Sequence, residues 1–227
     1  MTTQRSQEDI VREVLARPAQ AKRRLDERLR AFSHLPFLTD GLRKSHIQLV
    51  PEDPQPPPVD GKLIRKAKPG NVMLSEPYRE GHVVYFNIFQ ETDEINIDHP
   101  SDHFVGLPIL EAVRQVGMAI SHAVGDIPLD TRMSLQDFSL SFTQYIEHEY
   151  PIVVRGVTTL SYDRDLSGDV TVFSDVRQNG ETCLAATSSG RLYDTEKGYK
   201  KTRGKTLDLH RRQAEHFAAQ VGRGTSG

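Results

Sequence analysis

The chain has 227 residues, of which 37% are hydrophobic and 26% charged, a balance typical of a globular protein with one or two domains. Its formal net charge of −2 predicts no general attraction to nucleic acid or to an anionic membrane surface. Cys183 is the only cysteine, which excludes an intrachain disulfide and a thiolate metal cluster.

Residues 1–50 are predicted to form a helical extension, because apolar residues recur at helical spacing between about Gln7 and Phe32. Pro18 should divide or kink this region, and the region's many charges favour an exposed or partner-packing arm over a core element. The first nine residues lack the apolar stretch of a signal peptide, and no run approaches the ~18 apolar residues that cross a bilayer. We therefore expect a cytoplasmic protein.

A run of prolines between Pro51 and Pro58 predicts an extended linker, placed at residues 51–60. It would separate the extension from a domain at residues 61–195. The domain should begin with a short strand at residues 62–67 and another from Asn71. His82 to Phe89 is dense in β-branched and aromatic residues and follows a turn at Glu80-Gly81, which predicts a hairpin.

An amphipathic helix is predicted to begin near Pro108, which is tolerated in a first helical turn. Its apolar face is formed by Ile109, Leu110, Val113, Val116, Gly117, Ile120 and Val124. The opposite face carries Glu111, Arg114, Gln115, Met118 and His122. Such a polar face is most often simply a solvated helix surface.

Four strands are expected after this helix, which ends at Gly125 with Pro128 following. The chain's next apolar runs cover residues 133–145, 152–162, 169–176 and 182–193. Asn179-Gly180 predicts a hairpin between the last two, and Cys183 reads as a packed thiol in the final strand. Because the helix and strands are segregated along the chain, the predicted class is α+β with an antiparallel sheet. Residues 196–227 form a basic tail with a short helix near 207–221.

The loop before the helix is rich in groups that can move protons. Asp98, His99, Asp102 and His103 lie within ten residues of Gly106, where the helix is about to start. A loop carboxylate or imidazole near a helical Glu can perform acid–base chemistry. These residues and Glu111 are also metal-ligand types, but no cysteine lies nearby and Asp-His-Pro is typical of a turn, so we expect no metal and no cofactor.

A hairpin, a helix and then long antiparallel strands wrapped round that helix match the hot-dog fold. Within that class, the segment from Asp98 to Gly106 followed by Glu111-Ala112-Val113-Arg114-Gln115 resembles the signature of the A-factor biosynthesis (AfsA-like) hot-dog family. Ser121-His122 and the segment from Asp126 to Leu129 resemble it too, as Leu63-Ile64-Arg65-Lys66 does more loosely. The resemblance covers about Gly61 to Tyr193 and leaves both ends of the chain unexplained.

The resemblance implies transfer of a β-ketoacyl group from a carrier-protein or CoA thioester to a phosphorylated three-carbon alcohol, as in γ-butyrolactone signal synthesis. Family members usually carry two hot-dog repeats and this chain has room for one, so we expect a homodimer. The motif also resembles hot-dog hydroxyacyl-thioester dehydratases, where a loop His and a helical acid are catalytic. His99 is about two residues nearer the Gly than that pattern requires, so either His99 fills the role on a shortened loop or Asp98 or His103 does.

Acyl transfer needs a base for the attacking hydroxyl and donors for the oxyanion. The predicted catalytic residues are Glu111, His99 and Asp98, with Glu111 either orienting the attacking hydroxyl or acting as acid–base if burial raises its pKa. Predicted substrate contacts are Gly106, at the helix N-terminus, and Gln115, His103 and Arg114, the last of which can bind phosphate or pair with Glu111. A dehydratase or thioesterase, and a non-catalytic hot-dog binding module, are the alternative functions.

Overall fold

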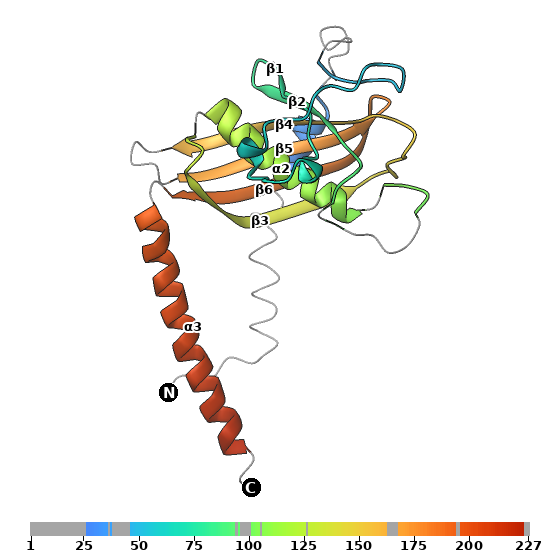
Figure 1. Cartoon of the computed structure of the whole chain (residues 1–227). Helices are drawn as coiled ribbons and strands as arrows, with labels where there is room; N and C mark the ends of the chain where they lie inside the picture. The colour runs from blue at the N-terminus through green and yellow to red at the C-terminus, as the bar shows by residue number, and fades with distance from the viewer. Residues whose placement is uncertain are drawn as a thin grey trace.

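One antiparallel sheet of six strands forms the body of the protein (Figure 1). The computed structural model describes residues 26–35, 37, 46–93, 95, 101–104, 106–125, 127–162, 168–193 and 196–224. The strands are β1 (Tyr78–Glu80), β2 (Val83–Ile88), β3 (Arg132–Phe142), β4 (Ile152–Tyr162), β5 (Gly168–Gln178) and β6 (Glu181–Tyr193), and their order across the sheet is β1-β2-β4-β5-β6-β3. Each neighbouring pair is antiparallel.

The helix α2 (Gly106–Gly125) lies across one face of this sheet, and its apolar side chains enter the main core. Gly156 in β4 allows the close approach, because a Cβ there would lie 2.5 Å from Ile120 Cδ1 and 3.2 Å from the Phe173 carbonyl oxygen. Cys183 is buried in the same core, as expected, and burial raises the pKa of its thiol. The structure therefore confirms the α+β hot-dog fold predicted from the sequence.

The turn between β5 and β6 is the one that the sequence predicted. Both of its central residues have left-handed backbone angles, with φ of 51° at Asn179 and 83° at Gly180. Two successive positive φ angles suit the right-handed twist of hairpin strands, and Asn-Gly tolerates them well. The turn fixes the register between β5 and β6.

The segment before β1 differs from the prediction. Residues 62–67 were expected to be a strand, but the chain forms short 3-10 helices η1 (Gly61–Ile64) and η2 (Pro69–Asn71). The Asp60 side chain caps η1 by accepting from the Lys62 N–H at 2.9 Å. The C-terminal end of the predicted linker is also part of the domain, because Val59 is buried in the core and its N–H donates to the Leu74 carbonyl. The proposed division into domains otherwise stays a prediction.

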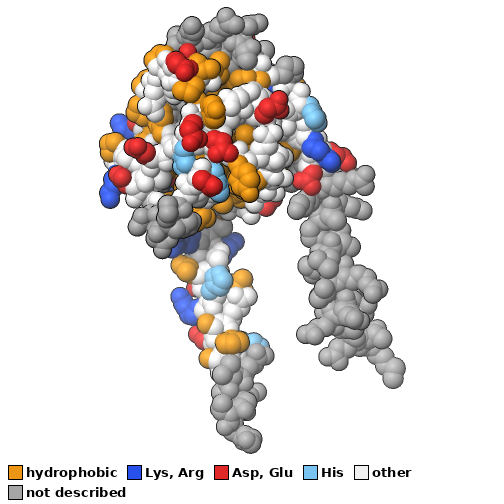
Figure 2. Space-filling model, turned by 90° about the vertical axis from the view of Figure 1, so that its right-hand side faces the viewer, with side chains coloured by type: hydrophobic (Ala, Val, Ile, Leu, Met, Phe, Trp, Pro, Cys, Tyr) orange, Lys and Arg blue, Asp and Glu red, His pale blue; other side chains and the backbone are white. Residues whose placement is uncertain are grey.

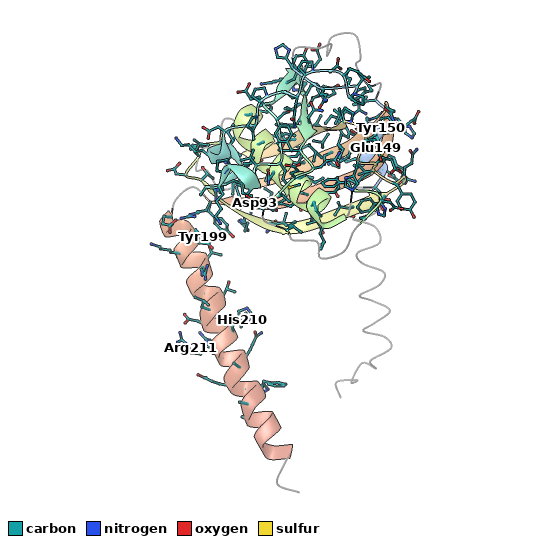
Figure 3. The ribbon with its side chains drawn as sticks, turned by 45° about the vertical axis from the view of Figure 1, so that its right-hand side comes forward. Asp93, Glu149, Tyr150, Tyr199, His210 and Arg211 are labelled. Carbon is teal, nitrogen blue, oxygen red and sulfur yellow. The ribbon has the colours of Figure 1, made fainter. Side chains whose placement is uncertain are left out.

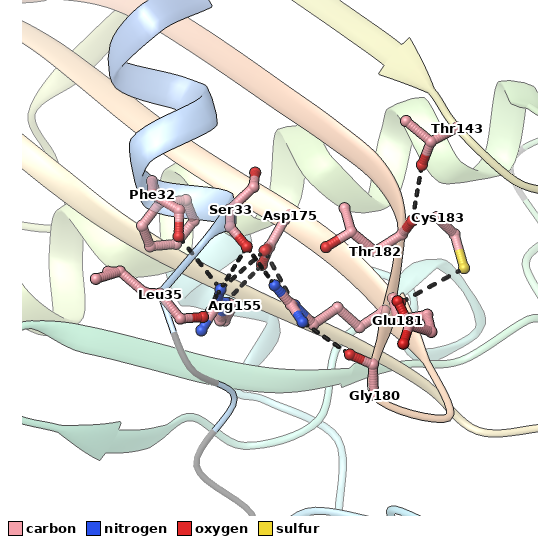
Figure 4. A network of polar contacts seen from close by, with 11 residues as sticks. Phe32, Ser33, Leu35, Thr143, Arg155, Asp175, Gly180, Glu181, Thr182 and Cys183 are labelled. Carbon is pink, nitrogen blue, oxygen red and sulfur yellow. Dashed lines mark hydrogen bonds and ion pairs between the residues drawn. The ribbon is translucent and has the colours of Figure 1, made fainter.

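A helical segment at residues 26–33 covers part of the opposite face of the sheet, so the expected exposed arm is wrong for this stretch. Its Leu29 and Phe32 are buried against Phe173. Beside them, Asp175 accepts hydrogen bonds from Arg155 Nε at 2.8 Å and Arg177 Nε at 3.0 Å (Figure 4). The rest of the predicted helical extension, residues 7–25, lies outside the described part of the chain.

The C-terminal helix α3 (Glu196–Gly224) is much longer than the short helix expected from the sequence. It leaves the sheet after β6 and points away from the domain (Figure 1). Tyr199 lies near the domain, whereas His210 and Arg211 lie farther out (Figure 3). Glu196 fixes its first turn through an ion pair with Arg132 at 2.8 Å. None of the helices in the described residues is both long and apolar enough to span a membrane.

Candidate active site

One flank of α2 carries three of the predicted site residues and faces the segment that contains η1 and η2. Glu111 lies on this flank with Arg114 one turn later and Gln115 beside it. Lys66, just after η1, reaches the same place from the other side. The polar side of α2 is therefore not a simply solvated surface, since Gln115 and His122 are buried there.

The Glu111 carboxylate is the centre of this cluster. Its Oε1 lies 2.8 Å from Lys66 Nζ and accepts from Arg114 Nη2 at 2.7 Å. Its Oε2 accepts from Arg114 Nε at 2.7 Å, so the guanidinium binds the carboxylate with two parallel hydrogen bonds. The predicted i,i+3 pairing of Arg114 with Glu111 is thus present. With two cations and one anion, the cluster has a net positive charge.

These contacts decide the protonation state of Glu111. Burial alone would raise the pKa of this carboxyl, but hydrogen bonds from Arg114, Lys66 and Gln115 outweigh burial and lower the pKa to about 2. The condition set for an acid–base role, a pKa raised by burial, is therefore not met. Glu111 is a carboxylate at neutral pH and holds the Lys66 and Arg114 side chains in place.

Gln115 ties α2 to the segment beside it. Its side chain is fully buried; Oε1 accepts from the Met73 N–H at 3.0 Å, while Nε2 donates to the Asn71 carbonyl at 2.9 Å. Nε2 also lies 3.0 Å from Glu111 Oε1. These bonds orient the carboxylate and fix the position of α2. A direct contact between Gln115 and substrate stays a prediction.

His103 and Gly106 lie together at the start of α2. They line a pocket of about 530 Å³ with Phe104 and residues 142–146. His103 Nδ1 lies 2.7 Å from Asp102 Oδ1, and its ring centre is 4.9 Å from that of Tyr145. The hydrogen bond with His103 lowers the pKa of Asp102. With a carboxylate at Nδ1, the tautomer that donates from Nδ1 leaves Nε2 as a proton acceptor.

Asp98 and His99, the other predicted catalytic residues, lie outside the described residues, so their position relative to α2 stays a prediction.

Glu111 follows Gly106 by five residues, which is roughly 7.5 Å along a helix axis. The two groups of site residues are therefore neighbours along α2 and occupy different parts of its surface. Carboxylate and histidine side chains lie close to hydrophobic ones on the face that Figure 2 shows.

Lys66 is the member of the cluster that the sequence analysis missed. It lies 45 positions or more from every residue of the Glu111-Ala112-Val113-Arg114-Gln115 motif, and its stretch was interpreted as a strand. Its Nζ is nonetheless close to Glu111, and only 8% of its side chain is exposed. The signal in the sequence was the basic pair Arg65-Lys66, which belongs to the weaker part of the family resemblance.

No group of three or more possible metal ligands occurs among the residues that the structure describes.

Solved structures similar to the chain include a thioesterase from Haemophilus influenzae, with 8% identity and a TM-score of 0.42 over 52% of this chain and 77% of that one. A protein from Helicobacter felis gives 8% identity and a TM-score of 0.43, covering 60% of this chain and 89% of that one.

Two curated proteins from Streptomyces griseus, both named 2-oxo-3-(phosphooxy)propyl 3-oxoalkanoate synthase, are 28% identical to the chain over 138 residues. The match covers 60% of this chain and 42% and 40% of the relatives, so the chain spans less than half of their length. The family model of the A-factor biosynthesis hotdog domain matches residues 47–194. That range holds Lys66, Glu111 and Arg114, and the chain belongs to the A-factor biosynthesis hotdog family.

Proposed function

We propose that the chain is an enzyme that transfers a β-ketoacyl group from a carrier-protein or CoA thioester to a hydroxyl acceptor. The observation that carries this proposal is the partly buried Lys66–Glu111–Arg114 cluster on the flank of α2. A carboxylate that fixes two cations creates a positively charged site suited to an anionic substrate group. The names of the relatives are consistent with this, since they describe a phosphorylated ester of an oxoalkanoate.

The reaction breaks the thioester C–S bond and forms a C–O bond to the acceptor. A base takes the proton of the acceptor hydroxyl, and the departing thiolate receives a proton. His103 suits the base role because Asp102 holds its Nδ1 and directs Nε2 to accept. Asp98 and His99 remain the other candidates. The first N–H groups of α2, at Gly106, suit the oxyanion because a helix N-terminus favours negative charge.

The state of Glu111 favours transfer over dehydration. A dehydratase of the hot-dog type requires a helical acid that can donate a proton, and a carboxyl with a pKa of about 2 does not hold one near pH 7. Arg114 instead presents a fixed guanidinium, which suits a phosphate on the acceptor. The acceptor that corresponds to a 2-oxo-3-(phosphooxy)propyl ester is dihydroxyacetone phosphate.

A homodimer remains part of the proposal, and one apolar strip supports it. β3 forms an edge of the sheet in the described residues, and its Leu135 and Phe142 are exposed. Leu107 and Leu110 on α2 are exposed as well. A second copy covering this strip would bury both sets of side chains. Light scattering of the purified protein and of a Leu107→Glu variant tests this: the variant should be monomeric.

Mass spectrometry of the reaction products tests the function. The protein is incubated with a 3-oxoacyl thioester of CoA or of a carrier protein, with and without dihydroxyacetone phosphate. The expected product is the phosphorylated ester, reduced at least a hundredfold in Glu111→Gln and unchanged in Glu149→Gln, which alters an exposed carboxylate elsewhere. Free acid alone would point to a thioesterase, an enoyl product from a 3-hydroxyacyl thioester to a dehydratase, and no turnover to a binding module.

A further inference from the structure

Positive charge is concentrated in the first three turns of the C-terminal helix α3. Four exposed cationic side chains, which we call the basic stretch, lie there: Lys200, Lys201, Arg203 and Lys205. The one acidic residue of these turns, Glu196, already pairs with Arg132 at 2.8 Å and lies 3.6 Å from Lys200 Nζ. The basic stretch covers roughly 7.5 Å of helix and presents far more positive than negative charge.

The distal part of α3 lacks this excess of cations. Between residues 206 and 219 two acidic and two basic residues balance, and Asp208 Oδ1 lies 3.5 Å from Arg211 Nη2. Tyr199, directly before the basic stretch, lies near the domain, whereas Arg211 lies farther out (Figure 3). A helix that served only to keep the protein soluble would not need its cations gathered at the end next to the domain.

The base of α3 is packed against the sheet. The Tyr199 ring meets the Tyr193 ring of β6 edge-on, with the ring centres 5.6 Å apart. The Arg132 guanidinium lies 6.0 Å from the centre of the Tyr199 ring and also holds Glu196. These contacts fix the direction in which the basic stretch leaves the domain. The surface is therefore formed in advance, which lowers the entropy cost of binding a partner.

A short series of contacts connects this base to the Glu111 cluster. The Arg65 guanidinium donates a hydrogen bond to the carbonyl of Thr131, the residue directly before Arg132. The next residue after Arg65 is Lys66, which pairs with Glu111. A partner bound to the basic stretch would therefore lie next to the segment that forms the candidate active site.

The composition of the basic stretch favours an acidic protein over a membrane or a nucleic acid. Residues 200–205 contain no large apolar side chain that could insert into a lipid bilayer. Four cations are fewer than the roughly 6–10 phosphate contacts of strong DNA binders, and the whole chain has a formal net charge of −2. An acidic protein surface requires neither insertion nor an extended array of phosphates, because opposite charges on two folded surfaces steer their association.

We propose that the basic stretch of α3 docks the acidic surface of the carrier protein that holds the acyl thioester. The inference rests on the proposed function only in taking the partner to be the donor of the acyl group, and it selects a protein-bound thioester over CoA. The family model matches residues 47–194, and α3 begins after that range. The docking surface therefore lies outside the hotdog domain itself.

Binding without turnover tests the surface. Fluorescence anisotropy measures the affinity of the full chain for an acidic bacterial fatty-acid carrier protein that bears no acyl group, with no acceptor present. The affinity should fall at least fivefold between about 50 and about 300 mM salt, because salt screens exposed charges. Duplex DNA and anionic lipid vesicles serve as comparison probes. Tighter binding to either of them, no binding of the carrier protein, or an affinity that does not depend on salt would overturn the proposal, whether or not acyl transfer is observed.

Charge reversal locates the contact. Lys201 and Lys205 are four residues apart and share one side of α3. Lys201→Glu combined with Lys205→Glu should weaken carrier binding at least tenfold, whereas Lys201→Arg combined with Lys205→Arg should retain it. Arg211→Glu combined with Arg212→Glu makes the same charge change in the distal part and should weaken binding less than about threefold.

The same variants separate docking from chemistry. In the transfer assay, the double Glu variant at positions 201 and 205 should raise KM for a carrier-bound 3-oxoacyl thioester at least tenfold and leave KM for the CoA thioester unchanged. Its thermal midpoint should match that of the wild type, because both side chains are exposed. Unchanged carrier affinity in this folded variant, or an equal loss in the distal variant, would refute the assignment of the surface.

Discussion

Replacing Glu111 by Gln tests whether this residue is a structural anion or a titrating acid. The substitution keeps the size of the side chain but removes its charge, so Lys66 and Arg114 lose their shared partner. The Glu111 side chain is only 13% exposed, and solvent therefore screens the interaction weakly. Lowering the pKa from 4.5 to about 2 corresponds to about 3 kcal/mol of folding free energy at neutral pH.

The same shift predicts how this contribution depends on pH. The pKa of Glu111 is lower in the folded than in the unfolded chain, so the stabilisation is fully present above the unfolded value of 4.5. It is lost as the pH falls from about 5 towards 2, because the folded state must then give up its carboxylate. The difference in stability between the wild type and Glu111→Gln should therefore be large at pH 7 and small at pH 3.

Urea unfolding at pH 7, 5, 4 and 3 measures that difference. At pH 7 the variant should lose about 3 kcal/mol, or roughly 6–12 °C in thermal midpoint for a chain of this size. Glu149→Gln serves as the matched control, since it removes an exposed carboxylate and should shift stability by less than about 0.5 kcal/mol. A loss below 1 kcal/mol at pH 7, or a loss independent of pH, would show that the cluster does not hold Glu111 as argued.

Three further predictions concern other parts of the molecule. Asp175→Asn should lower the free energy of unfolding, measured with denaturant, by about 3–5 kcal/mol, because the buried guanidinium groups of Arg155 and Arg177 lose their carboxylate. As a control, Asp169→Asn, which changes an exposed carboxylate on the same strand, should lower it by under about 1 kcal/mol. Lys66→Met should reduce kcat of the proposed transfer at least tenfold, with Lys66→Arg recovering part of it and Lys62→Met unchanged. Deleting residues 196–227 should lower the helical circular dichroism signal yet move the thermal midpoint by less than about 3 °C, since almost all of the α3 side chains that the structure describes are exposed.

Most of the fold could be predicted because its signals are local. The long strands can be identified from the strand-like spacing of their apolar residues. The turn at Asn179-Gly180 combines two residues that accept positive φ. Residues 62–67 were wrongly predicted as a strand because the apolar pair Leu63-Ile64 between basic residues fits a short strand as well as a helical turn, while the Asp60 cap that starts η1 has a weaker signal. The length of α3 was underestimated because its charged residues give little apolar periodicity.

The site was predictable only where its members share an element. Glu111 and Arg114 are three positions apart on one helix, so their pairing follows from helix geometry. Lys66 comes from a distant segment, and its hydrogen bond adds to those from Arg114 and Gln115 in lowering the pKa of Glu111. Burial of the carboxyl was foreseeable, but the sign of its pKa shift depends on cations that tertiary structure brings close.

Because Glu111 has no proton to give, proton transfer in the proposed reaction must occur at another group. His103, at the start of α2, has the geometry for it, since Asp102 occupies Nδ1 and leaves Nε2 to accept. The helix then separates two tasks, with proton movement near its N-terminus and anion binding about two turns later, at Arg114. Changing His103 to Asn should therefore lower kcat with little effect on KM for the phosphorylated acceptor, whereas Arg114→Gln should raise that KM at least tenfold. If both variants changed the same parameter in the same way, the two tasks would not be separate and the division of labour along α2 would be wrong.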